Sequence, residues 1–149
     1  MEGIPIVVPV RFAGRMLHAA LWVTQWMLAA VFEFAGMLKA CVPVEDLQHK
    51  LRFATNATAA LLRPVGILEM IASLALILPA ATQVFPRLTP IAATCLTVIA
   101  VFGASIHASG CGIGETLPDL VLAAAAAFVA WGRFGRASIT PFFQTRHGV

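Results

Sequence analysis

Charged residues are scarce in this chain of 149 residues. Only 11% of them are Asp, Glu, Lys or Arg, whereas soluble domains carry roughly 25%. Hydrophobic residues make up 60% of the sequence, and the mean hydropathy is +0.88. A soluble core of this chain length could not bury so much apolar surface. The composition therefore excludes an ordinary soluble domain and predicts an integral membrane protein.

Cysteine is also sparse, and its spacing excludes several kinds of site. Cys41, Cys95 and Cys111 form no CxxC pair, so a thioredoxin-like or vitamin K epoxide reductase-like relay has no support in the sequence. Metal binding lacks support because HASGC offers two ligands without a second cluster at matching spacing. No strand precedes the GxG of CGIGE, which excludes a nucleotide-binding loop. A disulfide between Cys41 and Cys111 stays open, because both map to the same end of the expected bundle.

The apolar residues gather into four stretches, each close to the ~20 residues that cross about 30 Å of hydrocarbon. They run roughly from Leu17 to Val42, Leu61 to Ala81, Leu88 to Ala108 and Leu117 to Phe134. We therefore expect an all-α integral membrane four-helix bundle that forms a single domain over residues 1–149. The start MEGIPIVVPV lacks a cleavable signal pattern, so the first span is expected to be an uncleaved anchor.

The distribution of basic residues predicts an orientation. With an even number of spans both termini lie on one side, and the terminal side carries more basic residues than the other. The terminal side has Arg11, Arg15, Arg87, Arg133, Arg136 and Arg146, and the opposite side has Lys39, Lys50, Arg52 and Arg63. The positive-inside rule then places both termini in the cytoplasm and loops 43–60 and 109–117 outside. We expect a short amphipathic helix at the interface within residues 43–60.

Two carboxylates within the spans are the strongest functional signal. A charge near the bilayer centre costs at least about 2.5 kcal/mol, so an intramembrane acid is normally paired, protonated or turned toward a cavity. Glu33 lies six residues before Lys39 and Glu69 lies six residues after Arg63, which places both acids roughly 9 Å inside the same membrane face. His107 closes the third span at that face. We expect Glu33, Glu69 and His107 to form a catalytic cluster.

Five further residues are candidates for binding a substrate beside these three. They lie on the helical faces of the acids or at the rim of the spans: Trp22, Trp26, Lys39, Arg63 and Ser73. The two indoles fall within about 40° of Glu33 and can line a flat apolar ligand, while Ser73 is one turn from Glu69. Purely structural roles stay open for these five residues and for the two acids. The acids can fasten helices together, the basic residues can snorkel, and the indoles can be packing or belt residues.

Several segments together resemble the DoxX-like integral membrane family. They are WVTQWMLAAVFEFAGMLK, RPVGILEMIASLALILP, LTPIAATCLTVIAVFGASIH and the final GR pair. The matching residues are Phe34, Gly36, Lys39, Gly66, Glu69, Pro79, Pro90, Ala92, His107, Gly132 and Arg133. The resemblance implies a four-helix bundle in a bacterial cytoplasmic membrane. Relatives are linked to thiosulfate and quinone oxidoreduction, to thiol redox balance or to membrane-protein assembly. Glu33 and the glycine-rich HASGCGIGE depart from the family pattern and suggest a specialised member.

Three classes of function remain open. The first is cofactor-independent acid/base chemistry on a small lipophilic substrate, such as isomerisation, cyclisation or epoxide opening, with one acid protonated and the other ionised. The second is a quinone-linked oxidoreductase subunit, and the third is a noncatalytic assembly or scaffold subunit. We favour the first, because its acids and base are visible in the sequence while no electron-transfer centre is. Expected partners are a lipophilic molecule, membrane lipid, a second copy or another membrane protein, and no nucleic acid.

Overall fold

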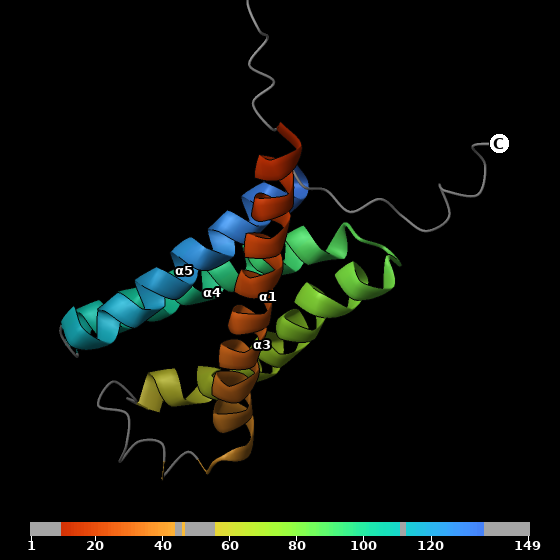
Figure 1. Cartoon of the computed structure of the whole chain (residues 1–149). Helices are drawn as coiled ribbons and strands as arrows, with labels where there is room; N and C mark the ends of the chain where they lie inside the picture. Colours follow the sequence, from red (N-terminus) through yellow and green to blue (C-terminus); the bar gives the residue numbers. More distant parts are fainter. Residues whose placement is uncertain (1–9, 44–45, 47–55, 111–112, 136–149) are drawn as a thin grey trace, which may run out of the picture.

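Four long helices make up almost all of the chain that the computed structural model describes, which is residues 10–43, 46, 56–110 and 113–135. They are α1 (Val10–Cys41), α3 (Asn56–Thr82), α4 (Leu88–Gly110) and α5 (Ile113–Phe134), drawn in Figure 1. Each contains an apolar segment of 19 to 28 residues that is long enough to cross a membrane. The predicted all-α class and the four apolar helices are confirmed. Most of the segment 43–60, where an interfacial helix was expected, lies outside the described residues, and so does Cys111.

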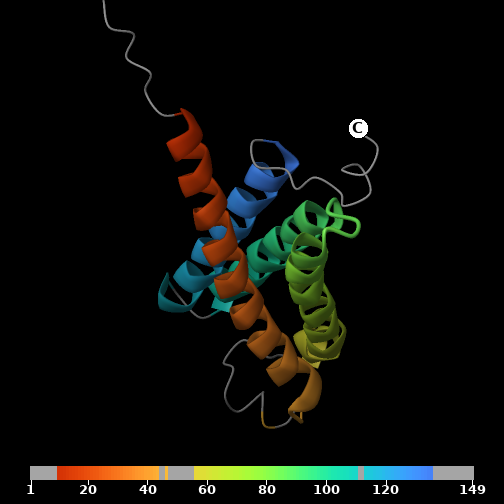
Figure 2. The same ribbon diagram turned by 45° about the vertical axis from the view of Figure 1, so that its right-hand side comes forward.

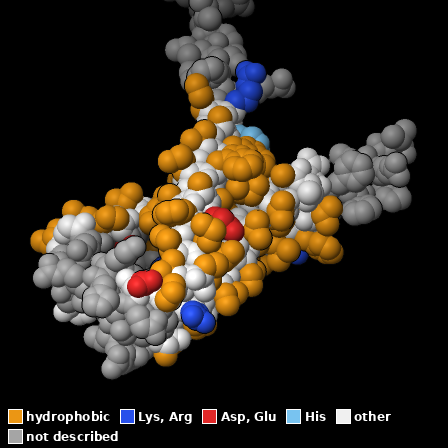
Figure 3. Space-filling model, turned by 90° about the horizontal axis from the view of Figure 1, so that it is seen from below, with side chains coloured by type: hydrophobic (Ala, Val, Ile, Leu, Met, Phe, Trp, Pro, Cys, Tyr) orange, Lys and Arg blue, Asp and Glu red, His pale blue; other side chains and the backbone are white. Residues whose placement is uncertain are grey.

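The surface of the bundle is apolar on the sides that face away from its core. Large hydrophobic side chains are more than half exposed on every helix, including Val23, Ile71, Val98 and Val121. In Figure 3 hydrophobic side chains, with few charged groups between them, dominate the described surface of the face shown. Soluble monomers rarely expose apolar patches of this extent. Lipid is the solvent that suits such a surface, as expected for a multi-pass membrane protein.

The helices pack as two antiparallel pairs, α1 with α3 and α4 with α5, around buried leucine and alanine side chains. Leu21, Leu28, Leu76, Leu96 and Ala126 are buried at the centre. Figures 1 and 2 show α3 and α4 joined at one end of the bundle. At the other end, the end of α1 and the start of α3 lie apart from the end of α4 and the start of α5. The two pairs therefore diverge at that end.

Two glycines set the register of α1 against α3. A Cβ atom added at Gly36 would lie 2.6 Å from the carbonyl oxygen of Gly66, and one added at Gly66 would lie 2.7 Å from the carbonyl oxygen of Gly36. Any larger residue would push the two backbones apart, and small residues of this kind are typical of close helix contacts in membranes. The contact places Lys39 of α1 against Glu69 of α3, at the diverging end of the bundle.

Candidate functional site

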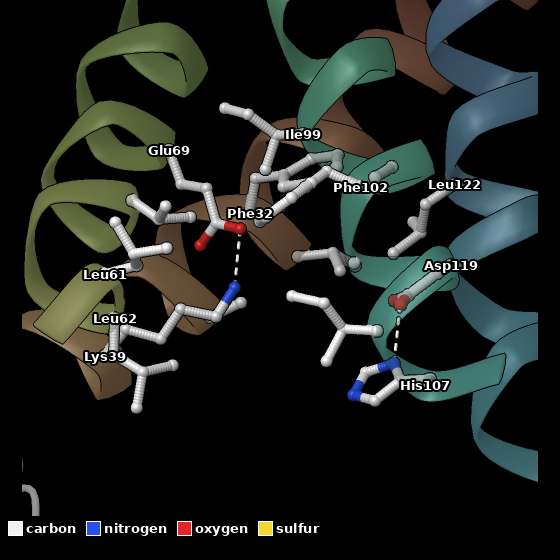
Figure 4. Close-up of a pocket in the computed structure, with 16 residues that line it drawn as sticks. Phe32, Lys39, Leu61, Leu62, Glu69, Ile99, Phe102, His107, Asp119 and Leu122 are labelled. Carbon is white, nitrogen blue, oxygen red and sulfur yellow. Dashed lines mark hydrogen bonds and ion pairs between the residues drawn. The ribbon is translucent and has the colours of Figure 1, made fainter. Parts of the chain in front are cut away.

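An apolar cavity of about 120 Å³ lies between the two helix pairs, and all four helices contribute to its wall (Figure 4). Most of the lining is hydrophobic, for example Phe32, Val65, Ile99, Phe102 and Leu122. Four ionisable side chains also line it: Lys39, Glu69, His107 and Asp119. Concave apolar sites with a few convergent polar groups are the usual form of small-molecule sites. This cavity is therefore the candidate functional site.

The wall formed by α1 and α3 carries an ion pair. The Lys39 ammonium donates to Glu69 Oε1 at 2.5 Å, and Glu69 is only 2% exposed. Its second oxygen, Oε2, is buried and has no hydrogen-bond partner among the described residues. A buried acceptor left without a donor costs about 1–3 kcal/mol. Glu69 thus lines the cavity as the partner of Lys39, while its second oxygen is buried within the protein.

The opposite wall, formed by α4 and α5, carries a second pair. His107 Nδ1 lies 2.6 Å from Asp119 Oδ2, so the ring N–H at this nitrogen donates to the carboxylate. Gly103, one turn before His107, makes room for the acid, because a Cβ at that position would lie 3.0 Å from Asp119 Oδ2. In Figure 4 the two pairs stand on opposite sides of the cavity.

Asp119 was not predicted as a site residue, because from the sequence it is only an acid on the outer side of the spans, near the start of the fourth. A usable signal exists in the chain. Asp119 follows His107 by twelve residues, with His107 near the end of α4 and Asp119 near the start of α5, so the two side chains return to the same depth in antiparallel helices. Ionisable residues at equal depth in neighbouring spans normally pair.

Glu33 lies outside the lining of the cavity. Its Oε2 accepts a hydrogen bond from the buried Ser73 hydroxyl, whose oxygen also lies 2.8 Å from the Met70 carbonyl oxygen. Ser73 is therefore the partner of Glu33, whereas the sequence suggested Glu69. The glycine contact explains the difference, because its register sets Lys39 opposite Glu69 and leaves Glu33 opposite Ser73, one turn further along α3. Of the three expected catalytic residues, Glu69 and His107 line one cavity and Glu33 does not.

The indoles and Arg63 also lie away from the cavity. Trp26 is 59% exposed, and Trp22 Nε1 donates to His18 Nε2 at 3.0 Å. Seventeen residues separate Trp22 from Lys39 in α1, which is about 25 Å along the helix axis. Arg63 is exposed and is not part of the lining. Among the five expected binding residues, only Lys39 lines the cavity.

A second polar cluster joins three helices far from the cavity. Gln25 of α1 is fully buried, and its Nε2 donates to the Leu76 carbonyl of α3 at 2.8 Å. Its Oε1 accepts from Arg133 of α5 through Nε at 2.8 Å and Nη2 at 2.5 Å. The Arg133 guanidinium also lies 5.3 Å from the Trp22 ring centre. Arg133 thus fastens the bundle, whereas from its sequence it is expected to be one of the charges that set orientation and a match to the family pattern.

Metal-binding groups are not clustered in the described part of the chain: no three His, Cys, Asp or Glu side chains there could share an ion. Cys41 and Cys95 are free thiols. The polar chemistry of the cavity therefore consists of two carboxylates, one imidazole and one ammonium group. These groups can accept, donate and hold protons in an apolar surrounding.

Comparison with known proteins finds one family. The model of the DoxX-like family matches residues 23–129, while no curated protein and no solved structure matches the chain. The matched range contains Glu33 and all four ionisable residues of the cavity, and it ends before Gly132 and Arg133. It covers well over half of the sequence and reaches into all four apolar helices. This multi-pass membrane protein therefore belongs to the DoxX-like family.

Proposed function

We propose that this protein takes up small lipophilic molecules from the bilayer and catalyses proton transfer on them without a cofactor. One observation carries the proposal: the Lys39–Glu69 and His107–Asp119 pairs line opposite walls of a single apolar cavity. Acid/base catalysis of a proton transfer requires an acid and a base that both reach the same substrate molecule. The cavity offers one of each on separate helix pairs.

The residues that line the cavity allow a substrate to enter it from the lipid bilayer. Val31, Leu61 and Phe102 line the cavity and are 40%, 48% and 48% exposed. All three lie within the membrane-spanning segments. The cavity wall is therefore continuous with the apolar surface that lipid covers, and a hydrophobic substrate can move into it without crossing water.

The proposed roles follow from the contacts. In the proposed isomerisation, Glu69 removes a proton from one substrate atom and His107 delivers a proton to another atom. The product of such an isomerisation has the same composition as the substrate, and a proton returned from Glu69 to His107 restores the site. Lys39 and Asp119 are positioning residues, because they hold the carboxylate and the imidazole in place in the way that an acid orients the histidine of a hydrolase triad. Glu33, which binds Ser73 outside the cavity, has no part in the proposed proton transfer.

The first test is mass spectrometry of small molecules retained by the full chain after gentle purification. We expect a lipophilic compound that is enriched in the wild type and lost from a Glu69→Gln, His107→Gln double variant. The matched control is Trp26→Phe, an exposed position outside the cavity, which should retain the compound. Identical small-molecule profiles in all three proteins would contradict the proposal. A retained quinone would instead favour the oxidoreductase alternative.

One observation favours a second candidate, an assembly or scaffold subunit. The Lys39 ammonium already neutralises Glu69, and Ser73 already binds Glu33, so the intramembrane acids are engaged within the chain. In a scaffold these contacts would serve only to fasten α1 to α3. A stoichiometric partner protein in the same purification, with no retained lipophile and no effect of the double variant, would support this function.

We also propose a location. The excess of arginine on the terminal side of the spans favours the cytoplasmic membrane of a bacterium with both termini in the cytoplasm. The cavity lies toward the Lys39 end of α1, so in this orientation it lies closer to the outer leaflet. Substrates would then come from that leaflet.

A further inference from the structure

The outer face of α1 carries a regular row of side chains, which we call the α1 seam. Its members are separated alternately by three and four residues: Met16, Ala19, Val23, Trp26, Ala30, Glu33 and Met37. All of them are exposed except Glu33, which is half-buried. A repeat that averages 3.5 residues is the pattern by which one helix packs along another over several turns.

The rest of the bundle packs against other faces of α1. Leu21, Leu28 and Phe32 are buried in the core, and Gly36 contacts the backbone of α3. The α1 seam therefore faces outward, and it lies within the membrane-spanning segment Gly14–Cys41. Its neighbour is either lipid or another membrane-spanning helix.

Glu33 distinguishes the α1 seam from an ordinary lipid-facing surface. Among the described residues its carboxyl group has one hydrogen-bond partner, the Ser73 hydroxyl, which binds Oε2. The other oxygen, Oε1, has no partner there and is not one of the buried oxygens, so it reaches the surface of the bundle. Lipid tails offer no hydrogen-bond donor, and intramembrane acids normally pair with another group. A helix that packs along the seam can provide that group.

A second copy of this chain fits the α1 seam. Two copies inserted in the same orientation have parallel α1 helices, and a two-fold axis along the membrane normal sets each seam residue against itself. Glu33 of one copy then meets Glu33 of the second copy at the same depth. Two carboxyl groups that face each other in an apolar surrounding can share one proton. Each accessible oxygen thus obtains a hydrogen bond without any other polar residue.

The neighbours of Glu33 in the α1 seam allow the close approach that this pair requires. Ala30 lies three residues before Glu33, on the same face of the helix, and Ala19 is a second small member of the row. Small residues let helix backbones approach each other in membranes. A single polar position in an apolar heptad row also fixes the register of the two helices. Only the parallel arrangement in register brings the two Glu33 side chains together.

We propose that this protein forms a parallel homodimer through the α1 seam, in which the Glu33 carboxyl groups of the two copies bind each other across the two-fold axis. No seam residue lines the cavity, so this inference does not depend on the reaction proposed there. It gives Glu33 a role in assembly of the dimer, while Glu69 and His107 serve the cavity.

The test measures the dimer fraction of the full chain in liposomes by counting single-molecule photobleaching steps as the lipid-to-protein ratio rises. We expect a wild-type dimer whose dissociation constant rises about fivefold to thirtyfold in Glu33→Leu, the usual effect of losing a hydrogen bond between membrane helices. Glu33→Gln should dimerise like the wild type, because an amide both donates and accepts. The control is Val98→Leu, at a position of α4 that is 64% exposed, and it should change nothing.

Cysteine cross-linking tests the geometry while Glu33 is intact. In a chain whose native cysteines are replaced by alanine, Ala30→Cys should form a disulfide between copies on oxidation in the membrane, because the two-fold axis brings the two positions together. Val31→Cys is the matched control. It lies at nearly the same depth of α1, is 40% exposed and points to a different face, so it should not cross-link.

Each contrary result would overturn a stated part of the proposal. Wild-type chains that are monomers at every lipid-to-protein ratio would show that lipid alone covers the α1 seam, and the homodimer would be wrong. A dimer that is equally stable in Glu33→Leu would overturn the pairing of the carboxyl groups. Equal cross-linking through Ala30→Cys and Val31→Cys would overturn the seam as the interface.

Discussion

Glu33 and Glu69 show how two similar residues acquire different roles from their surroundings. Both are glutamates within apolar helices, and both are bound by a side chain of the neighbouring helix. Glu69 nevertheless lines the cavity and keeps one oxygen without a partner among the described residues, whereas Glu33 does not line it. The proposed chemistry therefore depends on Glu69 at the residue scale.

The consequence is a difference between two matched variants. Glu69→Gln should lower the turnover of the retained compound by about 10²–10⁴-fold, the usual contribution of a general base. Glu33→Gln should lower it by less than about tenfold, because the amide can still accept from Ser73. The measurement is conversion of the compound by each purified variant under single-turnover conditions. Equal losses in both variants would show that the two acids act together, as the sequence alone suggested.

The sequence predicts the residues of the site better than their partners. Glu69, His107 and Lys39 are identifiable because ionisable groups in apolar spans are rare. The partner of each one depends on the register between helices, and that register follows from the contact of Gly36 with Gly66. Counting residues from the end of a span fixes depth to about one turn, which is too coarse to choose between Glu69 and Ser73 as a neighbour.

At the scale of the helices, the backbone contact between α1 and α3 is the feature that positions the first ion pair. It also makes a prediction about stability. Gly36→Ala places a methyl group 2.6 Å from a carbonyl oxygen, so the two helices must separate. We expect the free energy of unfolding to fall by about 1–3 kcal/mol, as is usual for overpacking. The fraction of folded protein is followed by far-UV circular dichroism as SDS is added to dodecylmaltoside micelles.

The control for this prediction lies in the same helix. A Cβ at Gly14 meets nothing within 4 Å, so Gly14→Ala should leave stability unchanged or raise it by about 0.5–1 kcal/mol through lower chain entropy. If Gly36→Ala and Gly14→Ala unfolded at the same SDS fraction, the backbone contact would not determine the stability of the α1–α3 pair.

Helix number and type follow from hydropathy, but the helix ends do not. The first apolar stretch begins near Leu17, while α1 begins at Val10. The second was expected from Leu61, whereas α3 begins at Asn56. Apolar stretches report only the part of a helix that lies in hydrocarbon. Helical structure continues beyond it, where polar residues are soluble.

At the scale of the whole molecule, the proposed orientation is open to direct measurement. A green fluorescent protein fused after residue 149 should fluoresce, because it folds in the cytoplasm, and alkaline phosphatase at the same point should be inactive. Phosphatase inserted in the 109–117 loop should be active, since that loop is expected outside. The reverse pattern would place the cavity toward the inner leaflet and would contradict the orientation drawn from the arginines.

The arrangement of the helices around one another is the part that the sequence could not provide. It predicts four spans that run in alternating directions, and it suggests that ionisable groups collect at one end. It does not show that α1 pairs with α3 and α4 with α5, nor that the pairs diverge to leave a cavity. Those features depend on side-chain volumes at many contacts, such as Gly132 against Leu21, which no single-sequence pattern encodes.

The network of Gln25, Arg133 and the Leu76 carbonyl has a mechanical consequence. It ties α1, α3 and α5 together far from the cavity, near the end where α3 and α4 are joined. A rigid rotation of one helix pair about this fixed region moves each point in proportion to its distance from the pivot. Displacements would therefore be smallest around this network and would grow toward the Lys39 end of the bundle.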